Sequence, residues 1–305
     1  TEALTVLGSI QAYQGNVTAA IKTFRKTIRL GSIDDKVYSN LLLCMNYSEQ
    51  CQQKDIFKWS RQWAKKFKDK SIIHPQAKRS RIRIAYLSPD YRRHSVSYFF
   101  LPLLECHDRT LFEIFCISDV ATPDDVTARM SDLADGWRDI HGLTNDEAEK
   151  VIREVAPDIL VDLAGHTGQT IRLSLFANRP APVQASWLGY PNTTGMTQID
   201  YRLTDATADP ELPEVDAFYS EKLVRLPGCF LCYQPPDDAP DVSPLPAFKN
   251  GYITFGCFNM LPKLQEGLIK DWSEILNHVS GSKLVLKNHF RSEEHTSELQ
   301  SRLHL

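Results

Sequence analysis

The sequence has no long hydrophobic run and no excess of one charge. No apolar segment approaches the roughly 20 residues that span a bilayer, and no signal-peptide pattern is present. The first residue is Thr1 rather than Met, which leaves the natural start open. The formal net charge is -3 at pH 7, so the chain carries no basic field for nucleic acid. We therefore expect neither a membrane nor a nucleic-acid partner.

Cysteine is sparse and follows no framework. The seven cysteines are an odd, scattered set, which indicates a reducing compartment and predicts a cytoplasmic location. Cys229 and Cys232 have the spacing of a metal or redox pair, but no second pair or nearby histidine completes a site. Because structural zinc takes four ligands, we interpret these two as packing cysteines and expect no metal.

Residues 1–70 have a helical pattern. Leu4, Leu7, Ile10 and Tyr13 predict one amphipathic helix, and the spacing of small residues such as Gly8 is typical of a tetratricopeptide repeat. A second, degenerate helix pair is expected at 36–45 and 55–67. An ordinary helical hairpin is the alternative. Since such repeats stack in arrays of about three or more, we expect this segment to be the end of an array that holds a partner.

A linker is expected at residues 71–81, which include Pro75. Its basic cluster of Lys78, Arg79 and Arg81 is typical of a solvated surface.

From residue 82 the pattern changes to alternating strands and helices, which predicts an α/β fold with a doubly wound parallel sheet. The first such domain is expected at 82–247. Its expected strands are 82–87, 112–118, 139–140, 159–163, 201–204 and 222–226, and its expected helices are 96–106, 124–133 and 145–155.

A proline-rich stretch, 237–248, separates this domain from the start of a second one at 248–290. The second domain is expected to have strands at 253–255 and 283–287 with a helix at 265–279 between them, after which the pattern stops. Residues 291–305 can be read from a common sequencing-adaptor oligonucleotide in one frame. We therefore expect this tail to be read-through and exclude it from the fold.

Three side chains are candidates for chemistry at strand ends, where open α/β sheets bind ligands. His94 follows the first strand of the sheet, and a histidine there can act as a general base or donate a hydrogen bond to an anion. His166 lies between Gly165 and Gly168, where little side-chain bulk is expected to shield it. Lys263 follows the first strand of the second domain, where phosphates commonly meet helix N-termini. Each has a structural alternative when taken alone.

Taken together, the motifs are specific. They occur in this order: Ser88-Pro89-Asp90-Tyr91-Arg92-Arg93-His94-Ser95-Val96, Asp162-Leu163-Ala164-Gly165-His166-Thr167, Arg179-Pro180-Ala181-Pro182-Val183-Gln184, Trp187 to Gly195, and Phe258-Asn259 with Lys263. From about Arg81 to Phe290 the chain closely resembles the catalytic region of the protein O-GlcNAc transferase and SPINDLY family.

The resemblance implies a GT-B glycosyltransferase with two Rossmann-like domains, the second one truncated here. Such an enzyme works without a metal or other cofactor. It would transfer a sugar from a nucleotide diphosphate, with inversion, to serine or threonine hydroxyls of protein acceptors held by the repeats and the cleft.

The resemblance also assigns roles to residues. His94 matches the family's active-site histidine, and Lys263 matches the lysine that neutralises the departing diphosphate. A leaving dianion needs fixed positive charge where charge develops. The substrate-binding residues that it implies are His166, Thr167, Leu188, Gly189, Tyr190, Pro191 and Asn259.

Two departures from the family pattern weaken the expectation that this chain is active. Met260 stands where the family usually has Asn or Gln, and Pro262 precedes the lysine. Most of the second domain, which supplies the nucleotide pocket, is missing. We therefore expect this chain alone to bind nucleotide sugar poorly and to be inactive.

The donor is left open by the sequence. UDP-GlcNAc is the first expectation. GDP-fucose is the second, because Gly189-Tyr190-Pro191-Asn192-Thr193-Thr194-Gly195 looks SPINDLY-like. The alternative from another class is a non-catalytic tetratricopeptide binding module.

Overall fold

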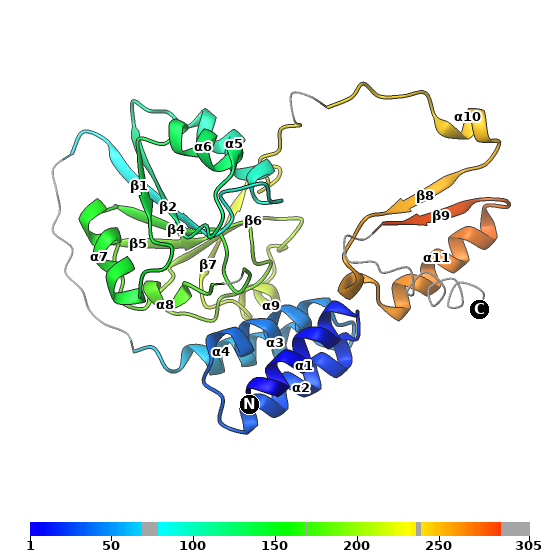
Figure 1. The fold of residues 1–305 in the computed structure, drawn as a ribbon, viewed down its shortest axis with the longest axis horizontal. Coiled ribbons are helices and arrows are strands. Elements are labelled where there is room, and N and C mark those ends of the chain that lie inside the picture. The colour runs from blue at the N-terminus through cyan, green and yellow to red at the C-terminus, as the bar shows by residue number, and fades with distance from the viewer. Residues whose placement is uncertain (69–78, 169, 236–238, 288–305) are drawn as a thin grey trace. The chain divides into compact units, whose positions relative to one another are not determined.

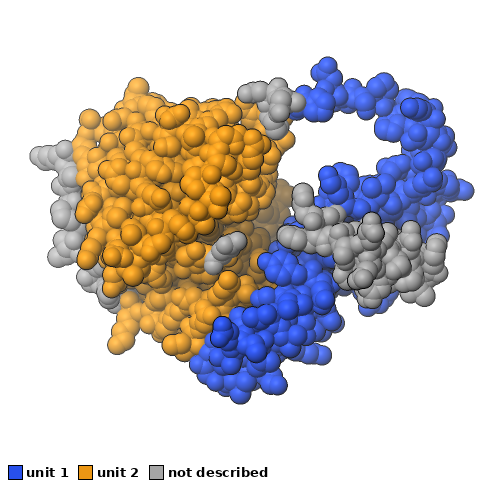
Figure 2. Space-filling view, viewed as in Figure 1, with its two compact units in different colours: residues 1–32, 47–51, 238–305 blue, residues 33–46, 52–237 orange. Residues whose placement is uncertain are grey.

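The structure is a computed structural model that describes residues 1–68, 79–168, 170–235 and 239–287. The chain forms two compact units (Figure 2). The first contains residues 1–32, 47–51 and 238–305, and the second contains residues 33–46 and 52–237. The expected read-through tail at 291–305 lies outside the described residues, and the domain limits expected from the sequence stay predictions.

The second unit is built on a seven-stranded parallel sheet of order β3-β2-β1-β4-β5-β6-β7 (Figure 1). The strands are β1 (Ile82–Ser88), β2 (Phe112–Ser118), β3 (Gly136–Asp139), β4 (Ile159–Asp162), β5 (Val183–Ser186), β6 (Tyr201–Asp205) and β7 (Lys222–Leu226). All the pairings are parallel. The predicted doubly wound α/β fold is therefore confirmed.

Helices cover both faces of this sheet. They are α5 (Ser97–Cys106), α6 (Asp125–Leu133), α7 (Asn145–Val155) and α8 (Leu173–Phe176), whereas the short helix α9 (Pro213–Asp216), between β6 and β7 in sequence, buries none of its side chains. Ile84 and Tyr86 of β1 pack in one apolar cluster with side chains of α5 and α6. Ala85 and Leu87 pack in a second cluster, on the opposite face, with side chains of α7 and α8. Because alternate residues of β1 are buried on opposite faces, the strand reads as a continuous apolar run.

Two more helices belong to the second unit: α3 (Asp35–Tyr47, except its last residue) and α4 (Gln53–Ala64). Trp63 of α4 is buried in the same cluster as α7 and α8. The indole N–H of Trp63 donates to Asp35 at 2.8 Å, which joins α4 to the start of α3. This helix pair is therefore part of the hydrophobic core around the sheet.

The first unit begins with α1 (Glu2–Tyr13) and α2 (Val17–Arg29). A Cβ added at Gly8 would lie 2.7 Å from the ring of Phe24, so only glycine allows this contact between the helices. The predicted inward face of α1 is wrong in part, since Leu7, Ile10 and Tyr13 are exposed. The repeat assignment itself stays a prediction.

The rest of the first unit contains α10 (Pro246–Asn250), β8 (Thr254–Cys257), the 3-10 turn η1 (Leu261–Lys263), α11 (Glu266–His278) and β9 (Lys283–Leu286). Strands β8 and β9 pair in parallel on either side of α11 in sequence, as the predicted βαβ unit requires.

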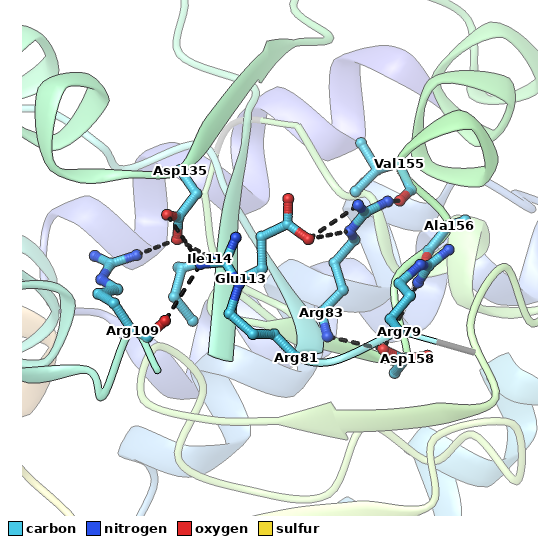
Figure 3. Close-up of polar contacts among 10 residues, drawn as sticks. All are labelled: Arg79, Arg81, Arg83, Arg109, Glu113, Ile114, Asp135, Val155, Ala156 and Asp158. Carbon is cyan, nitrogen blue, oxygen red and sulfur yellow. Dashed lines mark hydrogen bonds and ion pairs between the residues drawn. The ribbon is translucent and has the colours of Figure 1, made fainter. Parts of the chain in front are cut away.

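The amino ends of β1, β2 and β4 are held by an arginine–carboxylate network (Figure 3). Arg83 donates to Glu113 at 3.0 Å, and Arg109 contacts Asp135 at 2.5 Å. Arg79 donates to the carbonyl oxygen of Ala156 at 2.8 Å, and Arg81 lies 3.7 Å from Asp135. Arg79 is exposed, as the interpretation of the cluster as solvated surface requires, whereas Arg81 is half-buried and departs from it.

Candidate active site

The loops that carry the predicted site residues leave the carboxyl ends of β1, β4 and β5. Strand order reverses direction between β1 and β4. At such a switch point the adjacent loops diverge and leave a crevice where ligands bind. The loop after β1 carries His94, and the loop after β4 carries His166 and Thr167. A Cβ added at Gly168 would lie 3.2 Å from Pro89, so these two loops are in contact.

His94 is half-buried and lies beside a buried carboxylate. Its Nδ1 is 3.7 Å from Oδ1 of Asp90 and accepts a 3.3 Å hydrogen bond from the backbone N–H of Val96. Asp90 is fixed in turn: its own N–H donates to Ser88, and its carbonyl oxygen accepts from Ser97. The loop thus holds the imidazole through its Nδ1 edge and leaves Nε2 as the nitrogen for a ligand.

Burial sets the protonation of this pair. It lowers the pKa of His94 below its ordinary value, which the nearby Asp90 partly opposes. Burial likewise raises the pKa of Asp90, against the pull of His94 and Arg92. A histidine whose pKa is below 6.5 is mainly neutral at pH 7 and can accept a proton or a hydrogen bond. Asp90 belongs to the motif Ser88–Val96, but no role was predicted for it; its position four residues before His94 could have indicated the pairing.

The expected exposure of His166 is wrong. The residue is 1% exposed, and its ring lies between those of Trp63 and Tyr190, with centroids at 4.6 and 5.1 Å. Its Nδ1 is 2.8 Å from Oγ of Ser39, and its Nε2 is 3.0 Å from the carbonyl oxygen of Thr194. Both nitrogens therefore contact protein groups, and burial lowers the pKa of His166 to about 4. A substrate contact for this residue stays a prediction.

Thr167 lies next to His166 and is half-buried. Its hydroxyl donates to the carbonyl oxygen of Ala164 at 2.6 Å. Asp162, at the end of β4, is buried and accepts from the backbone N–H groups of Ala164 and Gly165 at 3.2 and 2.7 Å. Burial raises the pKa of Asp162 to about 6 despite these two bonds. The loop after β4 is thus shaped by the carboxylate at its base.

The loop after β5, residues 187–195, has an unusual backbone. Leu188 has φ of 74°, a left-handed conformation that costs a non-glycine residue of the order of 1 kcal/mol. A Cβ added at Gly189 would lie 2.2 Å from the carbonyl oxygen of Leu163, so only glycine allows the loops after β4 and β5 to cross here. Strain held at a predicted substrate loop supports a functional role for it.

Tyr190 and Pro191 differ in exposure. Tyr190 is 2% exposed, and its hydroxyl accepts from the side chain of Asn46 at 3.0 Å, so its ring points into the protein. Pro191 is exposed. Of these two predicted substrate-binding residues, Pro191 offers its side chain to solvent, and Tyr190 does not.

Two buried charged residues hold this loop through hydrogen bonds. Arg202 donates to the carbonyl oxygens of Tyr190 and Asn192 at 2.9 and 3.1 Å. Glu221 accepts from the hydroxyl of Thr193 at 2.6 Å and from the N–H of Thr194 at 2.8 Å. Neither residue could be identified from the sequence, because each lies outside the sequence motifs and meets the loop only through the fold.

A small cleft lies beneath the loop, but it has no room for a water-sized sphere, whereas typical small-molecule sites hold roughly 300–1,000 Å³. It is lined by Asp162, Gly165, Ser186, Trp187, Tyr190, Asn192, Thr194 and Arg202. A nucleotide sugar therefore needs more space than this cleft provides.

Lys263 and Asn259 lie in the first unit, whereas His94 lies in the second. Lys263 ends the turn η1, where its N–H donates to the carbonyl oxygen of Met260 at 3.0 Å, and its side chain is exposed. Asn259 is also exposed, in the loop between β8 and η1. The structure places both in the loop predicted to meet phosphate, and their roles stay predictions.

The interpretation of Cys229 and Cys232 as packing residues is wrong, since both are exposed.

Within residues 1–68, 79–168, 170–235 and 239–287, no cluster of three or more His, Cys, Asp or Glu residues is suited to hold a metal ion. In that part of the chain, no helix combines the length and the hydropathy needed to cross a bilayer.

Comparison with known proteins identifies the class as a glycosyltransferase. Residues 54–234 match glycosyl transferase family 41. The chain is 42% identical over 260 residues to the probable UDP-N-acetylglucosamine–peptide N-acetylglucosaminyltransferase SPINDLY of Arabidopsis thaliana, covering 81% of this chain and 28% of the relative. It is 33% identical over 216 residues to the probable transferase of the same description named SEC from that plant, covering 68% and 22%.

A solved structure agrees with this result. A mutant O-GlcNAc transferase from Thermobaculum terrenum superposes with a TM-score of 0.91 at 34% identity, over 99% of this chain and 58% of that one. The chain therefore belongs to glycosyl transferase family 41, the family of O-GlcNAc transferase and SPINDLY. It spans less than a third of the length of the two plant relatives.

Proposed function

We propose that this chain is part of a protein O-glycosyltransferase that transfers N-acetylglucosamine from UDP-GlcNAc to serine or threonine hydroxyls. The acceptor oxygen bonds to the anomeric carbon from the face opposite the nucleotide, and the diphosphate departs with the bonding electron pair. The acceptor hydroxyl loses its proton in the same process.

The observation that carries this proposal is the position and state of His94. Its imidazole lies at the carboxyl edge of a parallel sheet beside the switch point, half-buried against Asp90, with its pKa lowered by burial. With Nδ1 accepting from Val96, the neutral imidazole carries its proton on Nε2 and can donate a hydrogen bond to the sugar phosphate. In the other tautomer, with Nδ1–H facing Asp90, Nε2 can accept the proton of the acceptor hydroxyl. Lys263 supplies positive charge to the departing diphosphate in this proposal, and Pro191 and Leu188 border the acceptor.

The names of the two plant relatives support UDP-GlcNAc as donor. GDP-fucose is the second candidate, supported by the SPINDLY-like segment Gly189–Gly195. The proposed partners are protein acceptors held by the helical segment and the cleft.

Incubation of a full-length form with a protein acceptor and each donor separately tests the proposal. Mass spectrometry of the acceptor should show a mass gain on serine or threonine with UDP-GlcNAc, and the gain should be lost in the His94→Ala variant. Addition of a deoxyhexose with GDP-fucose alone would select the second donor. No addition with either donor would favour a non-catalytic binding module.

A further inference from the structure

The helix pair α3–α4 contacts the predicted substrate loop through a chain of side-chain amides. Gln53 and Asn192 exchange two hydrogen bonds, from Nε2 to Oδ1 at 2.7 Å and from Nδ2 to Oε1 at 2.9 Å. Asn192 also donates to Oδ1 of Asn46 at 3.0 Å. Asn46 then donates to the hydroxyl of Tyr190 at 3.0 Å. Four side chains, two on the helices and two in the loop, thus form one connected network.

The network is also bonded to the backbone, both in the loop and on α3. Oδ1 of Asn192 also accepts from the backbone N–H of Thr193 at 2.8 Å, and Nδ2 of Asn46 also donates to the carbonyl oxygen of Leu42 at 2.8 Å. Asn192 is 4% exposed, so a lost partner would leave a polar group without water. Buried networks of this kind fix geometry, because a shifted member loses bonds that it cannot replace.

A second contact lies at the far end of the loop. Arg61 of α4 donates to the carbonyl oxygen of Gly195 at 2.8 Å. A Cβ added at Gly195 would lie 2.5 Å from the backbone of Ser60, so the loop backbone lies directly on α4. The loop is thus held by the helix pair on one side and by Arg202 and Glu221 on the other.

We infer that Asn46 and Gln53 are positioning residues for the transfer reaction: they hold loop 188–195 in its strained conformation from the helical segment. The two residues act through Asn192 and Tyr190 and do not contact substrate. Leu188, at φ of 74°, would relax toward a common conformation without this support. The inference rests on the proposed function only in that this loop borders the reacting groups.

Hydrogen exchange on the 305-residue chain tests the support itself. In Asn46→Ala and in Gln53→Ala, the backbone N–H groups of residues 188–190 and 192–195 should exchange at least tenfold faster, while those of β1 and β2 keep the wild-type rate. Asn178→Ala is the matched control, since Asn178 donates to Glu149 at 2.5 Å and lies outside this network. It should leave exchange in 188–195 unchanged.

A conservative variant guards against misfolding. Asn46→Asp keeps an oxygen that can accept from Asn192 and from the hydroxyl of Tyr190, but it loses the donor to the carbonyl oxygen of Leu42. Exchange in 188–195 should therefore be slower than in Asn46→Ala and faster than in wild type. Unchanged exchange in 188–195 in both alanine variants would overturn the inference. So would equal exchange in Asn46→Asp and Asn46→Ala.

Kinetics of a full-length form supply the second readout. We expect kcat to fall about tenfold or more in the two alanine variants, since small misplacements at a reacting centre are costly, with the KM for the donor unchanged. Faster exchange with unchanged kcat would refute a role in the reaction. If the wild-type enzyme transfers no sugar, the proposed function fails, and hydrogen exchange alone still decides whether the helices hold the loop.

Discussion

The side chains of Ser39 and His166 form a 2.8 Å hydrogen bond across 127 positions of sequence. Ser39 lies on α3, and His166 follows β4 at the carboxyl edge of the sheet. The other ring nitrogen of His166 meets the carbonyl oxygen of Thr194 in the loop after β5. One imidazole therefore joins a helix to two loops of the predicted active site. Its protonation should therefore change the free energy of unfolding.

The first prediction concerns pH. Burial lowers the pKa of His166 from 6.5 to about 4 and raises that of Asp162 from 3.8 to about 6. Between pH 6.5 and 4, His166 is protonated in the unfolded chain but neutral in the folded chain. Its contribution to the free energy of unfolding therefore falls as the pH falls. Asp162 has the opposite effect: it is protonated at a higher pH in the folded chain than in the unfolded chain, so its contribution to the free energy of unfolding rises as the pH falls. At 1.36 kcal/mol per pKa unit, each effect is of the order of 3 kcal/mol, and the two oppose one another.

Urea denaturation between pH 7 and pH 4 separates these effects. The stability deficit of His166→Gln relative to wild type should shrink as pH falls, whereas that of Asp162→Asn should grow. Deficits that do not vary with pH in either variant would contradict the assigned protonation states.

The second prediction concerns the buried ion pair between Asp119 and Arg172. The guanidinium donates to both carboxylate oxygens, at 2.9 and 3.0 Å, and to the carbonyl oxygens of Ile140 and Leu143. Asp119→Asn leaves Arg172 buried without its counter-charge, which should cost about 3–5 kcal/mol. Thermal and urea denaturation measure this loss.

The control for that measurement is the exposed pair of Arg129 and Glu105, whose atoms lie 2.6 Å apart. Glu105→Gln should cost less than about 1 kcal/mol, because solvent screens the pair. Equal losses in the two variants would show that the Asp119 pair contributes no more than a surface contact.

The third prediction uses the end of α7. Ala156 is exposed and has φ of 49°, a left-handed conformation that glycine adopts without strain. Ala156→Gly should therefore stabilise the protein by roughly 0.5–1 kcal/mol. Ala217, an exposed alanine that ends α9 at φ of -60°, is the matched control. Ala217→Gly should destabilise slightly, so a gain in both variants, or in neither, would argue against relief of strain.

The sequence predicted most strands and helices within one or two residues, because alternation and capping are local signals. Strand β5 was missed, since its Val183-Gln184-Ala185-Ser186 carries little apolar signal. Gln184 is nevertheless fully buried, with its amide donating to the carbonyl oxygens of Phe176 and Gln198. Strand β3 was expected three residues later than it lies.

The predicted site residues divide in the same way: some have a local sequence signal, and others have surroundings that only the fold creates. The position of His94 after β1 follows from the strand pattern. The burial of His166 could not be predicted, because the residues that shield it, Trp63 and Tyr190, are far from it in sequence and come together only in the fold. The same reason hid the contacts of α3 and α4 with loop 188–195.

The fourth prediction concerns nucleotide binding by this chain alone. The cleft beneath loop 188–195 has no room for a water-sized sphere, so it cannot hold a nucleotide sugar. Titration calorimetry of the 305-residue chain with UDP or GDP should detect only weak binding. Tight binding of either nucleotide would contradict the expectation that the pocket needs residues beyond this chain.

The last prediction concerns Lys263 in a full-length form of the enzyme. If its ammonium neutralises the departing diphosphate, Lys263→Ala should lower kcat by roughly 10²-fold, because a fixed charge is lost where charge develops. Lys249→Ala, at the end of α10, is a control that removes the same charge outside the predicted phosphate loop. The leaving group supplies a sharper test: a donor whose nucleotide departs more easily should recover part of the rate in Lys263→Ala and gain little in wild type. Equal gains in the two enzymes would assign the lysine to ground-state binding instead.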